Sequence, residues 1–370
     1  MTETVVSAAI RAKVWDTEFF KEYVRSNRFK RYMGSSENSI IQVKNDLTKK
    51  KGDAITIALV GALDADAGPN DGSSTLVGFE KALPNDGHKI TIGVVRDATV
   101  VNMEEEQASA IDIRDAGKVA LKTLAMRYLR NSIITALGSV QGVPYATATE
   151  TQRDTWNTAN ADRILYGADA SNRVAGDNSA SIAVIAAGET LNRAMVSKLK
   201  RIAQDAENVN GDGIRPVTYG EDEETFVLFA GTRAYRDLKL DLATVHSDAM
   251  ARGKENPLFT GTTSLYWDGV VIREIPELAV YTAVGADPDG AGALLAGDIA
   301  PVYLCGAQAL GVAWAQTTKS TLRKEDDYGF QHGVGFSEMR GVEKILYGQG
   351  TAGAKDWGVV TGFVAAAADA

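Results

Sequence analysis

Apolar residues recur with a helical period over residues 112–137. They return every three or four positions, acidic residues stand in the first turn, and Gly138 follows the last apolar one. The pattern predicts a long helix of roughly 39 Å at 1.5 Å per residue. Its apolar band is broad, which indicates contact on several sides. The members of the band are Leu121, Leu124, Ala125, Tyr128, Leu129, Ile133 and Leu137.

A second amphipathic helix is predicted from Leu191 to Ile202, with Met195 and Leu199 on the same apolar face. It ends before the turn-forming residues "NVNGDG" at 208–213. The preceding residues 139–182 are rich in Gly, Ala and Asn and have weak periodicity. That composition is typical of an inserted or mobile loop.

Residues 54–60 and 89–101 alternate between apolar and polar positions as strands do. The connection between them carries the turn sequence "PNDG" twice, at 69–72 and 84–87. We therefore expect a long hairpin with a protruding tip at about 62–87. Because a two-stranded hairpin alone is marginal in water, another surface should cover it. Further strands are predicted at 225–230, 268–275, 301–315, 341–347 and 357–364.

The segment before the hairpin is basic and aromatic. Residues 15–33 space their aromatic residues as a helix does, Gly34 ends the pattern, and "SIIQVK" at 39–44 is extended. The segment has too few residues to bury its own aromatic side chains, so it must dock on another surface. Residues 11–51 carry a local charge of +6, so that, with Glu3 counted, residues 52–370 carry −14. The basic residues could meet DNA, the acidic body of a neighbouring copy, or solvent.

Composition and motifs exclude several function classes. A net charge of −9 gives no bulk attraction to nucleic acid or anionic membranes, and one cysteine, Cys305, rules out an intramolecular disulfide. We see no signal peptide and no apolar run long enough for a membrane helix. These features predict a soluble protein that stays in the cell that makes it.

No catalytic, metal or cofactor site is predicted, so we expect no enzyme. The P-loop, HExxH and GxSxG patterns are absent, and His88, His246 and His332 are scattered. "GQGTAG" at 348–353 matches GxGxxG but precedes a strand-like segment, so it is interpreted as a hairpin turn. The Asp-rich segment 64–72 lacks the acidic twelfth position of a calcium loop, and Cys305 should be buried and inert.

An acidic body with a basic arm, a protruding hairpin and a long helix suggests a self-assembling shell subunit. The sequence resembles the major capsid proteins of tailed phages, specifically the coliphage N-four-like coat family. The resemblance rests on "NRFKRYMG", "ENSIIQVK", "DLTKKKGD", "DLKLD" at 237–241, "NPLFTG" at 256–261, "DGVVIRE" at 268–274, "GAQAL" at 306–310, "DDYG" at 326–329, "GVEK" at 341–344 and "KDWGVV" at 355–360, together with Trp15, Phe19 and Phe20.

The resemblance implies an α+β fold of the Hong Kong 97-like type. Its parts would be an N-terminal arm (1–52), an extended loop (53–102), a peripheral domain (103–182) with the spine helix 112–137, an axial domain (183–315), a return to the peripheral domain (316–347) and a C-terminal strand (348–370). Two segments depart from the family: the extended loop is long and rich in Asp, and residues 139–182 match no part of the family pattern. The family's role would be an icosahedral shell around double-stranded DNA, assembled in the host cytoplasm and located in the virion.

The partners implied are other copies in pentamers and hexamers, packaged DNA without sequence specificity, and possible scaffold, portal and decoration proteins, with no membrane. Two alternatives stay open: an encapsulin-like nanocompartment shell, and an enzyme with an unfamiliar site. The arm's aromatic residues would dock on this or an adjacent subunit, and its charges would face a neighbour or DNA. The predicted subunit-interface residues are Arg25, Arg28, Phe29, Lys30, Arg31, Tyr32, Phe79 and Leu83.

Overall fold

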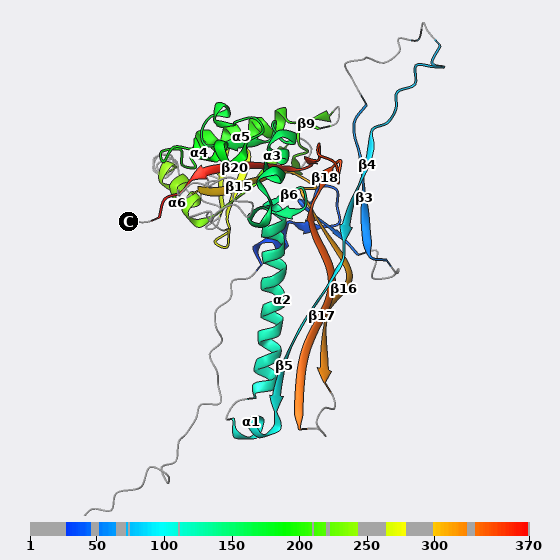
Figure 1. The fold of residues 1–370 in the computed structure, drawn as a ribbon, viewed down its shortest axis with the longest axis vertical. Helices are drawn as coiled ribbons and strands as arrows, with labels where there is room; N and C mark the ends of the chain where they lie inside the picture. Colours follow the sequence, from blue (N-terminus) through cyan, green and yellow to red (C-terminus); the bar gives the residue numbers. More distant parts are fainter. Residues whose placement is uncertain are drawn as a thin grey trace, which may run out of the picture. The chain divides into compact units, whose positions relative to one another are not determined.

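The computed structural model of the chain is shown in Figure 1. It describes residues 27–45, 52–63, 72, 75–109, 112–208, 211–219, 223–242, 264–278, 299–323 and 330–368. The chain divides into two compact units. The smaller unit contains Val94–Leu129 and Gln316–Met339, and the larger contains Arg28–Gly93, Arg130–Ala315 and Arg340–Ala370.

The smaller unit is built on most of one long helix, a short helix and long strands. Helix α2 (Ile113–Leu137) confirms the long helix predicted from the sequence, and Asp112 Oδ1 caps it by accepting a hydrogen bond from the Asp115 N–H. A Cβ on Gly117 would lie 2.9 Å from Thr99 Oγ1, so a larger residue there would require the Thr99 side chain to shift. The other elements are β5 (Gly93–Asn102), α1 (Met103–Ala108) and parts of β16 (Leu310–Arg323) and β17 (Gln331–Lys344).

The core of the smaller unit is narrow. Leu121 and Ala125 of α2 pack on Val334 and Phe336 of β17. Leu124 and Tyr128, which belong to the predicted broad band, are 39% and 48% exposed. Within the described part of the chain, the helix therefore buries one stripe and leaves the flanks of its band at the surface.

The larger unit contains a mixed seven-stranded sheet in the order β13-β14-β12-β15-β20-β8, with β11 paired to β12. Its strands are β8 (Ile164–Tyr166), β11 (Val217–Tyr219), β12 (Glu223–Ala230), β13 (Ser264–Trp267), β14 (Val270–Glu274), β15 (Ile299–Cys305) and β20 (Val359–Ala365). All seven residues of β20 are buried. This explains why its sequence, VVTGFVA, is apolar apart from Thr361, as in strands covered on both faces.

Helices of the larger unit gather around this sheet (Figure 1). Helix α5 (Arg193–Asp205), the second predicted helix, packs with α6 (Thr232–Asp241) against a face that includes Val360 and Val364. Phe363 belongs to a separate cluster with Trp156 of α3 (Glu150–Ala159). Because neighbouring residues of a strand point to opposite faces, β20 joins the two clusters.

Residues 139–182 correct our prediction of an inserted or mobile loop. They form β6 (Ser139–Val140), β7 (Val143–Pro144), η3 (Tyr145–Thr147), α3, β8, η4 (Ala170–Asn172) and α4 (Asn178–Ala183). Thr149 and Gln152 form a capping box at the start of α3. The periodicity of apolar residues is weak here because polar residues form part of the interior. Arg153, Arg163 and Asn178 are each at most 1% exposed.

The predicted hairpin is present, but its second strand lies at Asn85–Thr91 and not at 89–101. Strand β3 (Ala54–Val60) pairs antiparallel with β4 (Asn85–Thr91), joining Ala54 to Thr91 and Val60 to Asn85. The predicted strand 89–101 is divided between β4 and β5, which lie in different sheets, and the predicted turn 84–87 lies mostly within β4. Alternation continues through Gly93, so the pattern carried no sign of the break.

A similar break divides the predicted strand 301–315 between β15 and β16. Gln308 between them has φ +58°, a left-handed value that turns the chain. The turn predicted at "GQGTAG" is confirmed, because it joins the antiparallel strands β18 (Leu346–Tyr347) and β19 (Lys355–Asp356). A further short hairpin pairs β9 (Glu207–Asn208) with β10 (Gly211–Asp212). No described helix is long and apolar enough to cross a membrane.

Candidate interaction site

The aromatic residues of "NRFKRYMG" lie against this chain's own sheet. They form η1 (Arg28–Tyr32), a 3-10 helix. Phe29 is 0% exposed, and its ring meets Phe229 of β12 edge-on at 5.1 Å between centroids. Tyr32 meets the same ring at 5.4 Å. Such edge-to-face contacts between aromatic rings are favourable beyond the area they bury. The larger part of the predicted helix, residues 15–26, lies outside the described residues.

Polar contacts fix η1 in the same place. Arg28 donates to the Glu274 carbonyl oxygen at 2.6 Å and lies 4.0 Å from its carboxylate. Arg273 donates from Nε to the Tyr32 hydroxyl at 2.8 Å. Arg28 thus already has an acidic partner within its own chain.

The other predicted basic residues differ. Lys30 and Arg31 are exposed and form no ion pair with any residue that the structure describes. Arg25 lies outside the described residues. Lys30 and Arg31 are therefore the exposed basic residues that η1 can offer to another molecule.

The chain continues from η1 into the five-stranded sheet. Strand β1 (Met33–Gly34) pairs parallel with β2 (Ile41–Lys44), and β2 pairs parallel with β16. Ile40 and Ile41 are at most 3% exposed. The extended segment predicted at 39–44 therefore forms part of a folded sheet.

The predicted hairpin residues Phe79 and Leu83 are 68% and 53% exposed. Phe79 ends a turn in which its N–H donates to the Leu76 carbonyl oxygen at 3.0 Å. Gly78 has φ +89°, as the third residue of a type II turn requires. The turn exposes Val77 by 79%, more than any other large apolar residue described. With Leu76, which is 65% exposed, four large apolar side chains near the tip are thus exposed to solvent.

Side chains of the segment 343–349 bind the edge of strand β4. The sequence patterns do not predict this contact. Gln349 accepts from the Lys89 N–H at 2.7 Å and donates to the Lys89 carbonyl at 3.0 Å. Glu343 accepts from the Thr91 N–H at 3.0 Å. The two strands β4 and β18 lie side by side in Figure 1. These bonds satisfy backbone groups at the edge of β4, as a further strand would.

A buried histidine belongs to the same attachment. His88 is 0% exposed, and its Nδ1 accepts a hydrogen bond from the Leu346 N–H at 3.3 Å. Burial lowers the pKa of His88 to about 4, against the opposing effect of Asp86. Burial also raises the pKa of Glu343, whose carboxylate lies 3.7 Å from His88 Nε2. His88 is therefore a neutral acceptor near pH 7.

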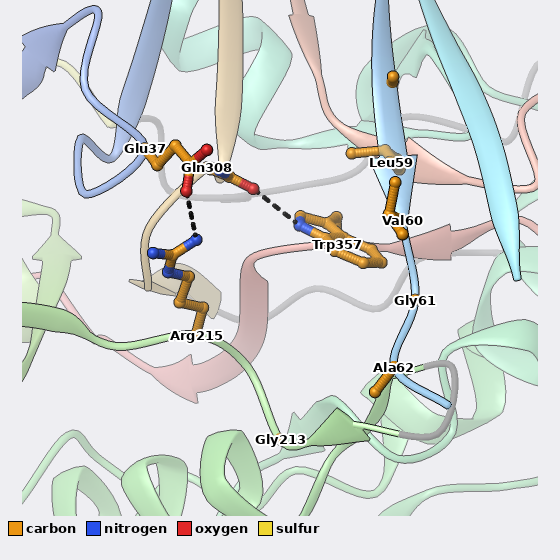
Figure 2. A pocket seen from close by; sticks show the side chains of 10 residues that line it. Glu37, Leu59, Val60, Gly61, Ala62, Gly213, Arg215, Gln308 and Trp357 are labelled. Atoms are coloured by element: carbon orange, nitrogen blue, oxygen red, sulfur yellow. Dashed lines mark hydrogen bonds and ion pairs between the residues drawn. The ribbon is translucent and has the colours of Figure 1, made fainter. Parts of the chain in front are cut away.

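A notch of about 400 Å³ lies between the hairpin and the body of the larger unit (Figure 2). Leu59, Val60, Gly61 and Ala62 line the hairpin side. On the body side, Arg215 lies 3.2 Å from the Glu37 carboxylate, and Trp357 donates to Gln308 Oε1 at 3.4 Å. The last lining residues are Ala58 and Gly213.

No sequence pattern predicts this notch. Its residues come from segments far apart in the chain, and no motif joins them. The "GAQAL" stretch contains Gln308, but nothing in it announces the left-handed backbone.

Other ionisable groups serve the fold. Lys344 and Asp356, each 1% exposed, pair at 2.8 Å, and Asp356 also accepts from Trp156 Nε1 at 3.1 Å. Cys305 is buried as predicted, and burial raises the pKa of its thiol.

Among the described residues, three carboxylates that could hold a metal ion lie together, those of Glu150, Asp154 and Asp177. They accept from the N–H groups of Ser179, Asn178 and Ala180 around the start of α4. Burial also raises the pKa of Glu150. Each carboxylate accepts a hydrogen bond from a backbone N–H at the start of α4. We therefore interpret the cluster as a cap of this helix.

The comparisons with known proteins agree on one class. Residues 3–368 match the model of a family described as phage capsid protein. The chain is similar to the capsid asymmetric unit of cyanophage Pam1, with 31% identity, a TM-score of 0.85 and full coverage of both chains. It is also similar in fold to the capsid of Ralstonia phage GP4 (19%, TM-score 0.73, full coverage of both) and the head of Helicobacter pylori bacteriophage KHP40 (14%, 0.67, 96% of both). A search of curated proteins finds no match.

Proposed function

This chain belongs to the phage capsid protein family, and on that premise we propose how its arm and hairpin join neighbouring copies. It is a major capsid protein, which self-assembles into the icosahedral shell of a tailed phage and is located in the virion. The resemblance and the Hong Kong 97-like α+β fold predicted from the sequence are confirmed. Of the three functions weighed, the family match favours the phage shell over the nanocompartment and the enzyme. The role is structural, and no residue is assigned to catalysis.

The hairpin tip is the proposed contact with a neighbouring copy. The observation that carries this proposal is the exposure of Val77, Phe79 and Leu83, by 79%, 68% and 53%. Fully burying such a side chain is worth about 1.5–3 kcal/mol. A contact between a tip and a different surface on the next copy is heterologous, and a heterologous contact can close into rings and shells.

The arm has two roles in this proposal. Phe29 and Tyr32 attach it to its own subunit through Phe229, while Lys30 and Arg31 face an acidic surface of a neighbour. The net charge of −9 makes such acidic surface abundant. The interior of the shell holds double-stranded DNA, bound without sequence specificity through its phosphates. Assembly takes place in the host cytoplasm, with scaffold, portal and decoration proteins as possible partners.

Replacement of residues 62–83 by a short Gly-Ser turn tests the hairpin proposal. This deletion leaves every pair of the ladder between β3 and β4 intact, including Val60 with Asn85. Because the tip's large apolar side chains are exposed, its loss should change the melting temperature of the subunit little. The variant should remain a folded, soluble subunit and fail to close into shells in sedimentation velocity and electron microscopy.

Leu240→Ser is the matched control, because Leu240 is 69% exposed on α6, outside the hairpin. It should assemble as the wild type does. Normal particles from the tip-less variant would refute the intersubunit role. A large fall in its melting temperature would instead show that the tip packs on its own subunit.

A further inference from the structure

We propose that the notch between hairpin and body receives the Leu76–Phe79 turn of a neighbouring copy's hairpin. This inference rests on the proposed intersubunit role of the hairpin and names the surface that receives the tip. It assigns one occupant, a second copy of this chain, and two anchor residues, Val77 and Phe79.

The tip has the form of a projecting knob. The type II turn from Leu76 to Phe79 is closed by its own hydrogen bond, and the Val77 N–H is bound by Thr75 Oγ1 at 3.3 Å. The backbone is thus ordered before any contact is made, which lowers the entropy lost on binding. The turn holds Val77 and Phe79 at the surface, with Glu80 immediately after them.

Part of the notch lining is apolar, as the knob is. Its hairpin side offers aliphatic surface, including Val60, which is 55% exposed. Trp357 supplies an aromatic ring, held by the hydrogen bond to Gln308 and stacked on Tyr347 at 5.9 Å between centroids. Phenylalanine packs well against such a ring in an offset or edge-on geometry.

The charge and the volume of the notch also fit the turn. Arg215 lies at the notch with 54% of its side chain exposed. Its guanidinium donates to Glu37 and, with five N–H donors in a fork, can take a second carboxylate such as that of Glu80. The volume of about 400 Å³ exceeds what one Phe side chain fills and admits the two side chains of the turn.

The left-handed backbone of Gln308, at φ +58°, belongs to the turn between β15 and β16 and fixes one wall of the notch. Here the turn at Gln308 places its side chain against Trp357 (Figure 2).

Knob and notch are different surfaces of one chain. Each copy can therefore donate a tip to one neighbour and receive a tip from another, which makes the contact directional around a ring. The tip that fills a notch also contacts the hairpin of the receiving copy through Leu59 to Ala62. Docking of one hairpin would in this way support the next.

The test is cysteine crosslinking between two variants, Lys81→Cys and Val60→Cys, mixed before assembly and treated with a short bis-maleimide. Lys81 is exposed beside the turn, so both anchor residues are kept. The native Cys305 is buried and should not react. Assembled mixtures should give covalent dimers at least tenfold above a control mixture of Lys81→Cys with Leu240→Cys. If Val60→Cys does not fold, Ala62→Cys takes its place at the same notch.

The outcomes separate this inference from the proposed function. Shells without excess dimers would overturn the notch as the receiving surface. A crosslink inside single, unassembled copies of the double variant would overturn it as well, because the tip would then fill its own notch. Normal shells formed by the variant that lacks residues 62–83 would instead refute the intersubunit role on which the inference rests.

Discussion

Replacement of Phe29 by Ala should destabilise the folded subunit before it affects any contact between subunits. The Phe29 ring is 0% exposed and meets Phe229 at 5.1 Å. Truncating a buried Phe to Ala costs about 3–5 kcal/mol, part of it from the lost aromatic pair. At roughly 2–4 °C per kcal/mol for a domain of about 200 residues, the melting temperature should fall by about 10 °C.

Thermal melting of the unassembled subunit, followed by near-ultraviolet circular dichroism, measures this effect. Lys30→Ala is the matched control, because Lys30 is the exposed neighbour in the same 3-10 helix. It should stay within about 0.5 kcal/mol of the wild type. If Phe29→Ala melts as the wild type does but does not assemble, the Phe29 ring docks on a neighbouring copy and our placement is wrong.

Two further variants test the interior and the arm. Lys344→Met leaves the Asp356 carboxylate buried without its partner at 2.8 Å, so chemical denaturation should show a loss of about 3–5 kcal/mol. Adding Asp356→Asn should recover part of that loss, and an equally unstable double variant would contradict the ion-pair argument. Lys30→Glu with Arg31→Glu should keep the wild-type melting temperature and block assembly without DNA, as measured by sedimentation. Empty shells formed as well as by wild type would favour a DNA-facing arm.

The sequence predicted elements best where burial follows a simple period. Helix α2 begins and ends within one residue of the predicted bounds, because Asp112 and Gly138 mark its ends. Helix α5 and strand β20 were recognisable for the same reason, one from a four-residue step and the other from a run that is apolar apart from Thr361. In each case the element's neighbours are apolar, so the pattern of the side chains records the packing.

Prediction failed where polar groups replace apolar ones in the interior. Arg153 is 1% exposed because Glu150 and the Ala148 carbonyl oxygen accept its hydrogen bonds. A window of residues 139–182 counts such an arginine as a surface position and so indicates a loop. The capping-box sequence at Thr149 and Gln152 was a usable sign of α3, but it is short and is outweighed by the surrounding polar residues.

The candidate site likewise has a part that the sequence predicts and a part that it does not. The arm's aromatic residues drew attention because they are too apolar for a free tail, and their contact with Phe229 supplies the surface they required. The attachment of β4 by Glu343 and Gln349 had no such sign, since both are ordinary polar residues on a distant strand and turn. Only the fold brings them to the edge of the hairpin.

The hairpin tip combines these two cases. Its few apolar residues stand among Gly, Asp and Pro, so no period identifies a strand or helix there. Yet Val77 and Phe79 are more exposed than an isolated soluble subunit needs. A residue that is buried only in the assembly leaves no periodic record within one chain, because its neighbours belong to the next copy. On our proposal, the exposure of Val77 and Phe79 in the single subunit is the trace that the contact between copies leaves in one chain.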